Sequence, residues 1–494
     1  MTHEEKLSRA EHAREALGKT AGAGVFRQKY HFMAPAGWIN DPNGCIWYGG
    51  KYHLYYQHNP YAAVWGSMHW GHAVSTDLVH WEHKPIALAP SEVYDDHPEG
   101  GVFSGSTIAY QDTLAALYTA TTNYGEGFVQ TQCLALSRDK GRTFEKFDGN
   151  PVIKSPPPGS SSDFRDPRVL RHGDFWYMVL GASLGDGAWH KGEGCAHLYK
   201  SKNLKDWEYC GIIARSEGRF GTMWECPDLF PLDGKWVLTF SPMFMGNRKM
   251  VYLVGEMDFD IPRFTIEKEG EIDWGREYYA SQSMLDDKGR RILIAWQNGW
   301  DWMPWWKDFG PTGQEGWCGC MTLPRKVSLD DQYRLFSEPV EELETLRRDQ
   351  KKSENIRIDT EKYSIPCMDP VSFELLMEVD LLRSNTKKLY LLVRAGDEKQ
   401  TVITFDLVGK KLIFDRNNAD NSYSRGICEC PLLLEDTVLR VHIFSDTVSI
   451  EIFTDGGRTC MSNTVYPTHS GQGLFLQAEG GEAYISTLIT WAMK

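Results

Sequence analysis

Long apolar runs are missing from this chain. Its 494 residues include no apolar stretch of roughly 18 residues, the length that a membrane-spanning helix needs. The N-terminal sequence MTHEEKLSRAEHAREALGKT carries charges throughout and lacks the apolar centre of a signal peptide. We therefore expect residues 1–24 to form a short solvated helical extension, and the protein to be cytoplasmic and free of membrane contact.

The chain also lacks an excess of positive charge. The sequence has 53 Lys and Arg against 67 Asp and Glu, which gives a formal net charge of -14. Binding to a polyanion requires a broad basic surface, so this balance argues against nucleic acid as a partner. A small carbohydrate fits better, because the 18 tryptophans include more than enough rings to stack against sugars, even with most of them in the core.

The cysteines form no recognisable framework. There are eleven of them, an odd number. Their spacing, with close pairs only at Cys318 and Cys320 and at Cys428 and Cys430, matches neither a disulfide scaffold nor a pair of zinc knuckles. We expect reduced thiols, and neither a metal nor another cofactor.

One pattern recurs along the first two thirds of the chain. An acidic residue and a proline are followed by a turn, a glycine and an aromatic-rich strand, and clear copies begin at Asp41, Asp166 and Glu225. Ser104 and Gln282 mark weaker copies. The starting positions 41, 104, 166, 225 and 282 differ by 63, 62, 59 and 57 residues, which indicates five structural units.

Units of this length, rich in short strands and without long amphipathic helices, are typical of a β-propeller. We predict an all-β fold in which residues 25–338 form a five-bladed propeller. Radial repetition brings the first strand of every blade to the central axis. The repeat therefore predicts that residues 41, 166 and 225 share one pocket.

The repeat ends near residue 339. The segment PVEELETLRRDQKK has apolar residues at helical spacing, which predicts a linker helix over residues 339–353. Beyond it, segments of alternating polarity separated by Gly, Asn and Asp predict an antiparallel β-sandwich over residues 354–494. We expect this domain to brace the propeller and to supply a homodimer contact.

Three carboxylates at repeat starts have surroundings suited to chemistry. Asp41 lies in the sequence WINDPNG, which alone indicates only a turn, but amide and tryptophan side chains nearby could surround a polyhydroxylated ring. Asp166 follows Arg165, whose guanidinium favours an ionised carboxylate. Glu225 is flanked by apolar and aromatic residues that would raise a carboxyl pKa by desolvation.

Glycoside cleavage uses such a set. One ionised carboxylate attacks or stabilises the oxocarbenium-like centre, and a protonated carboxyl group donates to the leaving oxygen. The residues alone leave the individual roles open, because the stereochemical outcome depends on carboxyl separation, about 5 to 5.5 Å for retention and about 6.5 to 9.5 Å for inversion.

Several motifs resemble glycoside hydrolase family 32, which comprises invertases, sucrose-phosphate hydrolases and fructanases. They are WINDPNG, YQHNP, WGHAVSTDLVHW, FSGS, FRDPR and WECPD, in the family's order, with DTVSIEIF resembling the family's C-terminal sandwich. The resemblance implies that Asp41 is the nucleophile, Asp166 the transition-state stabiliser and Glu225 the acid/base, acting with retention and without a metal. It also implies a fructosyl pocket lined by Asn40, Gln57, Trp65, Phe103, Ser104 and Arg165.

The expected function is hydrolysis of terminal β-D-fructofuranosides by an invertase-type β-fructofuranosidase. Sucrose, sucrose 6-phosphate and short fructo-oligosaccharides all stay candidates. The alternatives are a fructosyltransferase on the same scaffold and a noncatalytic sugar-binding protein, for which the same fold would serve. Two segments depart from the family pattern, YYASQ at 278–282 and the tryptophan-rich WQNGWDWMPWW at 296–306. We place the second segment at the pocket rim.

Overall fold

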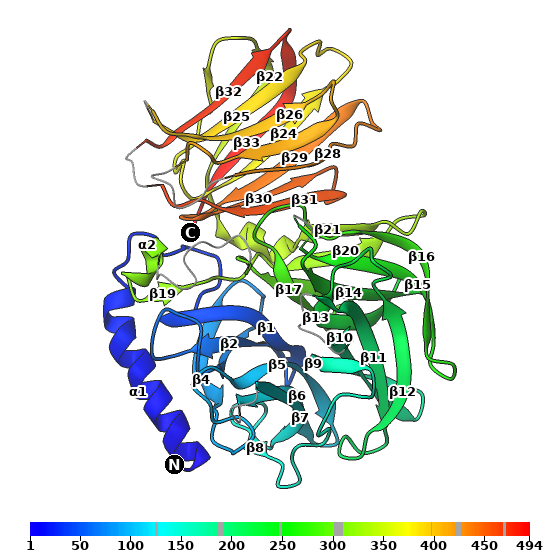
Figure 1. Ribbon diagram of the computed structural model, residues 1–494. Coiled ribbons are helices and arrows are strands. Elements are labelled where there is room, and N and C mark those ends of the chain that lie inside the picture. Colours follow the sequence, from blue (N-terminus) through cyan, green and yellow to red (C-terminus); the bar gives the residue numbers. More distant parts are fainter. Residues whose placement is uncertain are drawn as a thin grey trace.

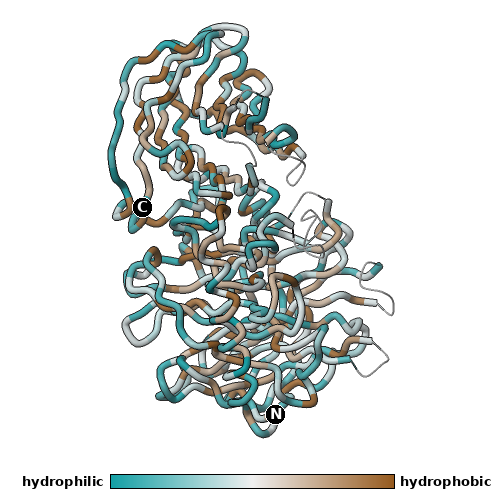
Figure 2. Tube along the Cα trace, turned by 90° about the vertical axis from the view of Figure 1, so that its left-hand side faces the viewer, coloured by the Kyte–Doolittle hydropathy of each residue, from teal (hydrophilic) through white to brown (hydrophobic). Residues whose placement is uncertain are grey.

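The computed structural model describes residues 1–123, 127–185, 191–246, 249–300, 310–396, 398–419, 426–467 and 471–494. Two β-rich domains are stacked, with the propeller below and the sandwich above (Figure 1). Hydrophobic stretches gather inside both domains, while many of the outer segments are hydrophilic (Figure 2). In the described ranges no helix is long and apolar enough to cross a membrane.

Five sheets make up the propeller, as the repeat predicts, and each contains four consecutive blade strands. Blades 1 and 2 contain β1 Gly37–Tyr48, β2 Lys51–Asn59, β3 His69–Ser75, β4 Trp81–Leu88, β5 Gly101–Tyr110, β6 Thr113–Asn123, β7 Phe128–Ser137 and β8 Glu145–Lys146. Blades 3 and 4 contain β9 Ser160–His172, β10 Phe175–Leu184, β11 Glu193–Ser201, β12 Glu208–Arg215, β13 Met223–Leu232, β14 Lys235–Met243, β15 Val251–Asp258 and β16 Arg263–Glu271. Blade 5 contains β17 Tyr279–Leu285, β18 Arg291–Trp296, β20 Arg325–Leu329 and β21 Leu335–Pro339.

The ring is closed by a short strand from the last unit. Between β18 and β20 the chain forms helix α2 (Gly310–Gly313) and strand β19 (Trp317–Cys318). Strand β19 pairs in parallel with β1, placing Gly37 opposite Trp317 and Trp38 opposite Cys318. Backbone hydrogen bonds thereby connect the end of the propeller to its first blade.

Every innermost strand carries a β-bulge where its repeat copy begins. The register shifts fall between Ile39 and Pro42, Val102 and Gly105, Arg165 and Arg168, Glu225 and Asp228, and Tyr279 and Gln282. Asp166 and Cys226 sit at these bulges with φ of 65° and 47°. Bulges redirect side chains and are common beside active sites, so the repeat pattern also marks where side chains turn towards the axis.

The N-terminal extension is helical, as predicted. Helix α1 spans His3–Ala21 and begins with a capping box in which Thr2 and Glu5 exchange hydrogen bonds. It runs along the outside of the propeller (Figure 1). Its Arg14 guanidinium donates to the backbone oxygen of Lys84, and Glu11 accepts from the backbone of Ile86, so α1 is fastened to β4.

The predicted linker helix over 339–353 is wrong beyond its first turns. A 3-10 helix spans Glu341–Leu346, and strand β22 then occupies Arg347–Ile358. The apolar residues Leu343 and Leu346 are buried against the propeller, which accounts for the helical spacing. Strand β22 is an edge strand stabilised by pairing with β33, and its largely exposed side chains show no apolar alternation that sequence could reveal.

Two six-stranded antiparallel sheets form the predicted sandwich. Besides β22, its strands are β23 Tyr363–Ser364, β24 Phe373–Asp380, β25 Lys388–Ala395, β26 Thr401–Asp406, β27 Lys411–Asp415, β28 Ile427–Pro431, β29 Val438–Ser445, β30 Ser449–Thr454, β31 Thr459–Thr464, β32 Gly473–Glu479 and β33 Ala483–Met493. Inward residues such as Leu375, Leu391 and Ile443 are fully buried between the sheets.

A buried ionic network connects the two domains. The guanidinium of Arg325, in blade 5, donates to Asp273 over 2.8 Å and to Glu451 of the sandwich over 2.5 Å. His31 lies between Glu451, at 3.1 Å, and Asp446, at 3.0 Å. The side chains in these ion pairs are completely buried, so polar contacts as well as apolar packing hold the sandwich on the propeller.

Candidate active site

A cavity of about 380 Å³ is lined by the bulged innermost strands of the propeller. Every residue predicted for the site contributes to it, although these residues come from separate repeat units. The lining residues are Asn40, Asp41, Gln57, Trp65, Glu99, Phe103, Ser104, Thr121, Phe128, Gln130, Asp163, Arg165, Asp166, Glu225, Met243 and Trp300. The structure thus brings together the three carboxylates that the repeat places at equivalent positions.

Asp41 is buried, and hydrogen bonds occupy both of its carboxylate oxygens. Oδ2 accepts from the Ser104 hydroxyl over 2.5 Å, and Oδ1 accepts from the Asn40 amide over 3.0 Å. Burial and the nearby charge of Glu225 raise the pKa of Asp41 to about 6, against the opposing effect of these hydrogen bonds. The carboxylate is therefore ionised at neutral pH and held in a fixed orientation.

Asp166 faces the same space from blade 3. Its Oδ2 accepts a hydrogen bond of 2.9 Å from the backbone N–H of Cys226, while its own N–H donates to Thr119. Burial and the charges of Glu225 and Asp41 raise the pKa of Asp166 to about 7, although the Arg165 guanidinium opposes this shift. Asp41 and Asp166 therefore compete for a proton near neutral pH.

The charge of Arg165 favours the ionised form of Asp166, as the sequence suggested, but its hydrogen bonds go to other carboxylates. Its Nε and Nη2 donate to Oε1 of Glu225 over 3.1 and 3.0 Å, and its Nη1 donates to Asp163 over 2.8 Å. The other oxygen of Glu225, Oε2, accepts a hydrogen bond from the Tyr279 hydroxyl. The polar partners of Glu225 differ from the apolar surroundings expected from its sequence neighbours.

A buried thiol lies between the two aspartates. The Sγ of Cys226 is 3.5 Å from Oδ2 of Asp41 and 3.6 Å from Oδ2 of Asp166. Burial and the negative charges around it raise the pKa of Cys226 well above its ordinary value, so it is a neutral weak donor to both carboxylates. All eleven cysteines are free thiols.

The residues predicted to bind the sugar form the wall around the carboxylates. Gln57 is buried and donates from its amide to the backbone oxygen of Val102 over 2.9 Å. The rings of Trp65 and Phe103 meet edge to face with centroids 6.0 Å apart, and both are partly exposed to the cavity. Aromatic edges and amides beside a carboxylate cluster suit a small polyhydroxylated ring.

Sequence reasoning missed part of the lining. The missed residues are Glu99, Thr121, Phe128, Gln130, Asp163 and Met243, together with the supporting Cys226 and Tyr279. Cys226 and Tyr279 lie at bulges, so their repeat position was an available signal. Glu99 and Phe128 belong to no recurring motif and reach the cavity only through the fold.

The tryptophan-rich segment 296–306 is partly described. Trp300 lines the cavity, whereas Trp296 is buried and packs against Trp38 with ring centroids 5.8 Å apart. Residues 301–306 of this segment lie outside the described residues. Within the described ranges, no group of three His, Cys, Asp or Glu side chains could hold a metal ion.

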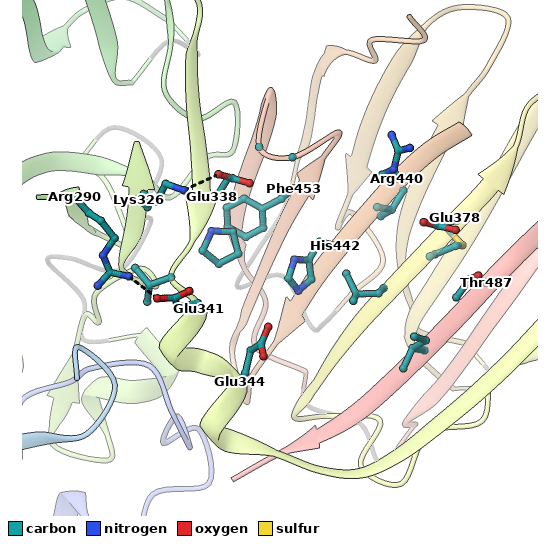
Figure 3. A pocket seen from close by; sticks show the side chains of 18 residues that line it. Arg290, Lys326, Glu338, Glu341, Glu344, Glu378, Arg440, His442, Phe453 and Thr487 are labelled. Atoms are coloured by element: carbon teal, nitrogen blue, oxygen red, sulfur yellow. Dashed lines mark ion pairs between the residues drawn. The ribbon is translucent and has the colours of Figure 1, made fainter. Parts of the chain in front are cut away.

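A second cavity, of about 510 Å³, lies between the domains (Figure 3). Its charged groups largely neutralise one another, since Lys326 pairs with Glu338 at 3.6 Å and Arg290 with Glu341 at 3.5 Å. Its acidic groups come from surface strands and the 3-10 helix rather than from the propeller bulges. The cavity lined by the innermost propeller strands, which we call the axial cavity, is therefore the candidate active site.

Comparisons with known proteins place both domains in one family. Residues 31–339 match the model of the glycosyl hydrolases family 32 N-terminal domain, and residues 342–492 match that of the family 32 C-terminal domain. The chain is 36% identical to a sucrose-6-phosphate hydrolase of Zymomonas mobilis, over 99% of this chain and 96% of that protein. It is 35% identical to a levanase of Bacillus subtilis, over 95% of this chain and 70% of the levanase.

Solved structures agree with this similarity. A family 32 β-fructofuranosidase of Bombyx mori superposes with a TM-score of 0.81 at 29% identity, covering 99% of this chain and 98% of that one. A sucrose-6-phosphate hydrolase from Lactobacillus gasseri superposes with a TM-score of 0.84 at 25% identity, covering 98% and 96%. The propeller and sandwich arrangement is shared over the full length.

Proposed function

The chain belongs to glycosyl hydrolase family 32, and on this premise we propose that its axial cavity hydrolyses terminal β-D-fructofuranosides. The observation that carries the proposal is the convergence of Asp41, Asp166 and Glu225 in one cavity from three blades. The relatives named sucrose-6-phosphate hydrolase and raffinose invertase support a hydrolase of fructosyl bonds. Sucrose, as for an invertase, is the substrate that we propose to test first.

Asp41 is proposed as the nucleophile. Attack on the anomeric carbon requires an ionised carboxylate with a fixed orientation, and the hydrogen bonds from Ser104 and Asn40 meet that requirement. A covalent fructosyl intermediate on Asp41 would then be hydrolysed by water, so that the anomeric configuration is retained.

Glu225 is proposed as the general acid and base. Arg165 occupies its Oε1 with two hydrogen bonds, so Oε2 is the oxygen that we propose gives its proton to the leaving sugar. In the second half of the reaction the same oxygen takes a proton from the attacking water. Tyr279 contacts Oε2 and holds it in position.

Asp166 is proposed to stabilise the transition state. The backbone N–H of Cys226 fixes its Oδ2, and its buried position strengthens any hydrogen bond that it accepts from a sugar hydroxyl as positive charge develops on the ring. The terminal fructosyl unit would be surrounded by the residues that the family resemblance implied, namely Asn40, Gln57, Trp65, Phe103, Ser104 and Arg165.

The test is hexose release from sucrose by the wild type and by the variants Asp41→Asn and Glu225→Gln. We expect each substitution to reduce kcat by a factor on the order of 10³ or more. Unchanged thermal unfolding of both variants shows that the fold is intact. Undiminished hydrolysis in either variant contradicts the proposed role of that residue.

Product analysis separates hydrolysis from the two alternatives. At high sucrose concentration a hydrolase gives equal amounts of glucose and fructose, whereas a fructosyltransferase gives glucose and longer oligosaccharides. A noncatalytic sugar-binding protein would show binding in calorimetry without release of hexose. The proton NMR signal of the first fructose anomer formed tests retention.

Two further proposals concern the whole protein rather than the cavity. We propose a cytoplasmic location and a homodimer formed through the β-sandwich, with the sandwich otherwise acting as a brace. Cell fractionation with an antibody against the protein tests the location. Light scattering during size-exclusion chromatography tests the dimer, and a single peak at the monomer mass contradicts it.

A further inference from the structure

We infer that the leaving-group side of the axial cavity is built for an uncharged sugar, so that sucrose is a better substrate than sucrose 6-phosphate. This inference rests on the proposed function. The residues proposed to surround the fructosyl unit account for only one part of the cavity. The remaining lining residues are Glu99, Thr121, Phe128, Gln130, Asp163, Met243 and Trp300. The proposed function gives them no contact with the fructosyl unit, and we place the departing sugar against them.

Acidic groups outnumber basic groups in this cavity. Five carboxylates are among its described lining residues, and two of them, Glu99 and Asp163, have no proposed part in the bond cleavage. The single cation among the described lining residues is Arg165. Even with Asp166 and Glu225 both protonated, the described lining residues carry three negative charges against one positive charge.

The Arg165 guanidinium already has protein acceptors for its hydrogen bonds. Arg165 donates through Nε and Nη2 to Glu225, and through Nη1 to Asp163 at 2.8 Å and to Gln130 at 3.3 Å. Recognition of a phosphate ester relies on N–H donors of Arg or Lys that are free to point at its oxygens. To bind a phosphate, Arg165 would have to give up a buried carboxylate partner, which disfavours the exchange.

Glu99 adds a negative charge to the cavity lining. Its side chain is exposed and forms no ion pair within the described part of the chain. Asp163 is more enclosed, with 19% of its side chain exposed, and forms an ion pair with Arg165. A phosphate dianion entering the cavity that these two carboxylates line meets repulsion that the protein walls screen less than bulk water does.

The other lining residues suit a neutral sugar ring. Phe128 is 43% exposed, and Met243 and Trp300, which line the same cavity, are partly exposed. Apolar surface of this kind packs against the C–H face of a pyranose, while the amide of Gln130 and the carboxylate of Asp163 can bond to its hydroxyls. Carboxylates that repel a phosphate serve as acceptors for uncharged hydroxyl groups.

The test compares kcat/KM for sucrose and for sucrose 6-phosphate with purified full-length protein at neutral pH and low ionic strength. We expect the wild type to use sucrose at least about tenfold better. Added salt should narrow the difference, because screening weakens repulsion over a Debye length of about 10 Å at 0.1 M. Equal or better use of the phosphorylated sugar overturns the inference, whereas no hydrolysis of either sugar overturns the proposed function instead.

Variants that each remove one carboxylate show which residues cause the preference for sucrose. In Glu99→Gln and Asp163→Asn, the ratio of kcat/KM for sucrose 6-phosphate to that for sucrose should rise about three- to tenfold. The matched control is Glu361→Gln, an exposed glutamate of the sandwich, which removes the same charge far from the cavity and should leave the ratio unchanged. An unchanged ratio in both cavity variants contradicts the role given to these carboxylates.

Discussion

The Tyr279 hydroxyl donates a hydrogen bond to Oε2 of Glu225, although the two residues are 54 positions apart and belong to different blades. Arg165 occupies the other oxygen of Glu225. The carboxyl group is thus held at both ends, with a permanent cation on one side and a neutral hydroxyl on the other. This asymmetry designates Oε2 as the oxygen that exchanges the proton.

Replacing Tyr279 with Phe should reduce kcat by about tenfold and leave KM within about twofold, because one hydrogen bond that orients the proton donor is lost. Steady-state kinetics with sucrose measure both constants. Tyr278→Phe is the matched control, because the buried Tyr278 hydroxyl has no hydrogen-bond partner among the described residues. A larger loss in the control than in Tyr279→Phe contradicts the positioning role.

The effect of Glu225→Gln should depend on the leaving group. Loss of the proton donor should lower kcat for sucrose about 10³-fold, because the departing oxygen of sucrose must be protonated. An aryl β-fructofuranoside with a phenol of pKa about 7 needs little protonation, so its rate of fructosyl transfer to Asp41 should fall much less. The burst of phenol in stopped-flow experiments measures this step, and equal losses for both substrates argue against Glu225 as the acid.

Activity should fall on the acidic side of neutrality. The pKa of Asp41 is raised to about 6 by burial and by the charge of Glu225, and a protonated Asp41 is not a nucleophile. The acidic limb of kcat/KM against pH should therefore lie near pH 6 and report Asp41 and Asp166 together, because their titrations are linked.

Ser104→Ala should move this limb to higher pH. The Ser104 hydroxyl donates to the ionised form of Asp41 and so lowers its pKa, and without it the carboxyl group holds its proton more tightly. A pH profile of kcat/KM for both proteins measures the change. Movement of the limb towards lower pH would contradict the geometry around Asp41.

The domain junction should lose stability as the pH rises. Burial lowers the pKa of His31, but its hydrogen bonds and charge interactions with Asp446 and Glu451 raise it to about 9, above the ordinary 6.5. Because the folded pKa is the higher one, this stabilisation is complete below about pH 6.5 and is lost between about pH 6.5 and 9. This pKa shift of His31 contributes on the order of 3 kcal/mol to the free energy of unfolding.

His31→Gln should therefore destabilise the protein by about 3 kcal/mol at pH 6 and by much less at pH 9. Urea unfolding at both pH values measures the difference. His80→Gln is the control, since the His80 side chain is 64% exposed and its substitution should change stability by no more than about 0.5 kcal/mol. Equal destabilisation by His31→Gln at both pH values would mean that His31 is not charged in the folded protein.

The sequence repeat was sufficient to predict the five-bladed propeller and the shared pocket of three carboxylates. Repeat starts at 41, 104, 166, 225 and 282 all fall at bulges of innermost strands, because a radial repeat places equivalent positions at the same depth around the axis. Asp41, Asp166 and Glu225 could therefore be assigned to one pocket from the sequence. Their individual roles came from the resemblance to a family, since local sequence carries no distances.

Only the tertiary structure decided which partners these residues have. Arg165 turns away from its neighbour Asp166 and binds Glu225 and Asp163, because the bulge of β9 aims adjacent side chains in different directions. His31 meets Asp446, 415 positions away, where the two domains join. The sequence could not predict strand β22. This edge strand is stabilised by backbone pairing with β33 rather than by an alternating pattern of its own side chains. Contacts between distant segments arise from chain packing, and no local pattern encodes them.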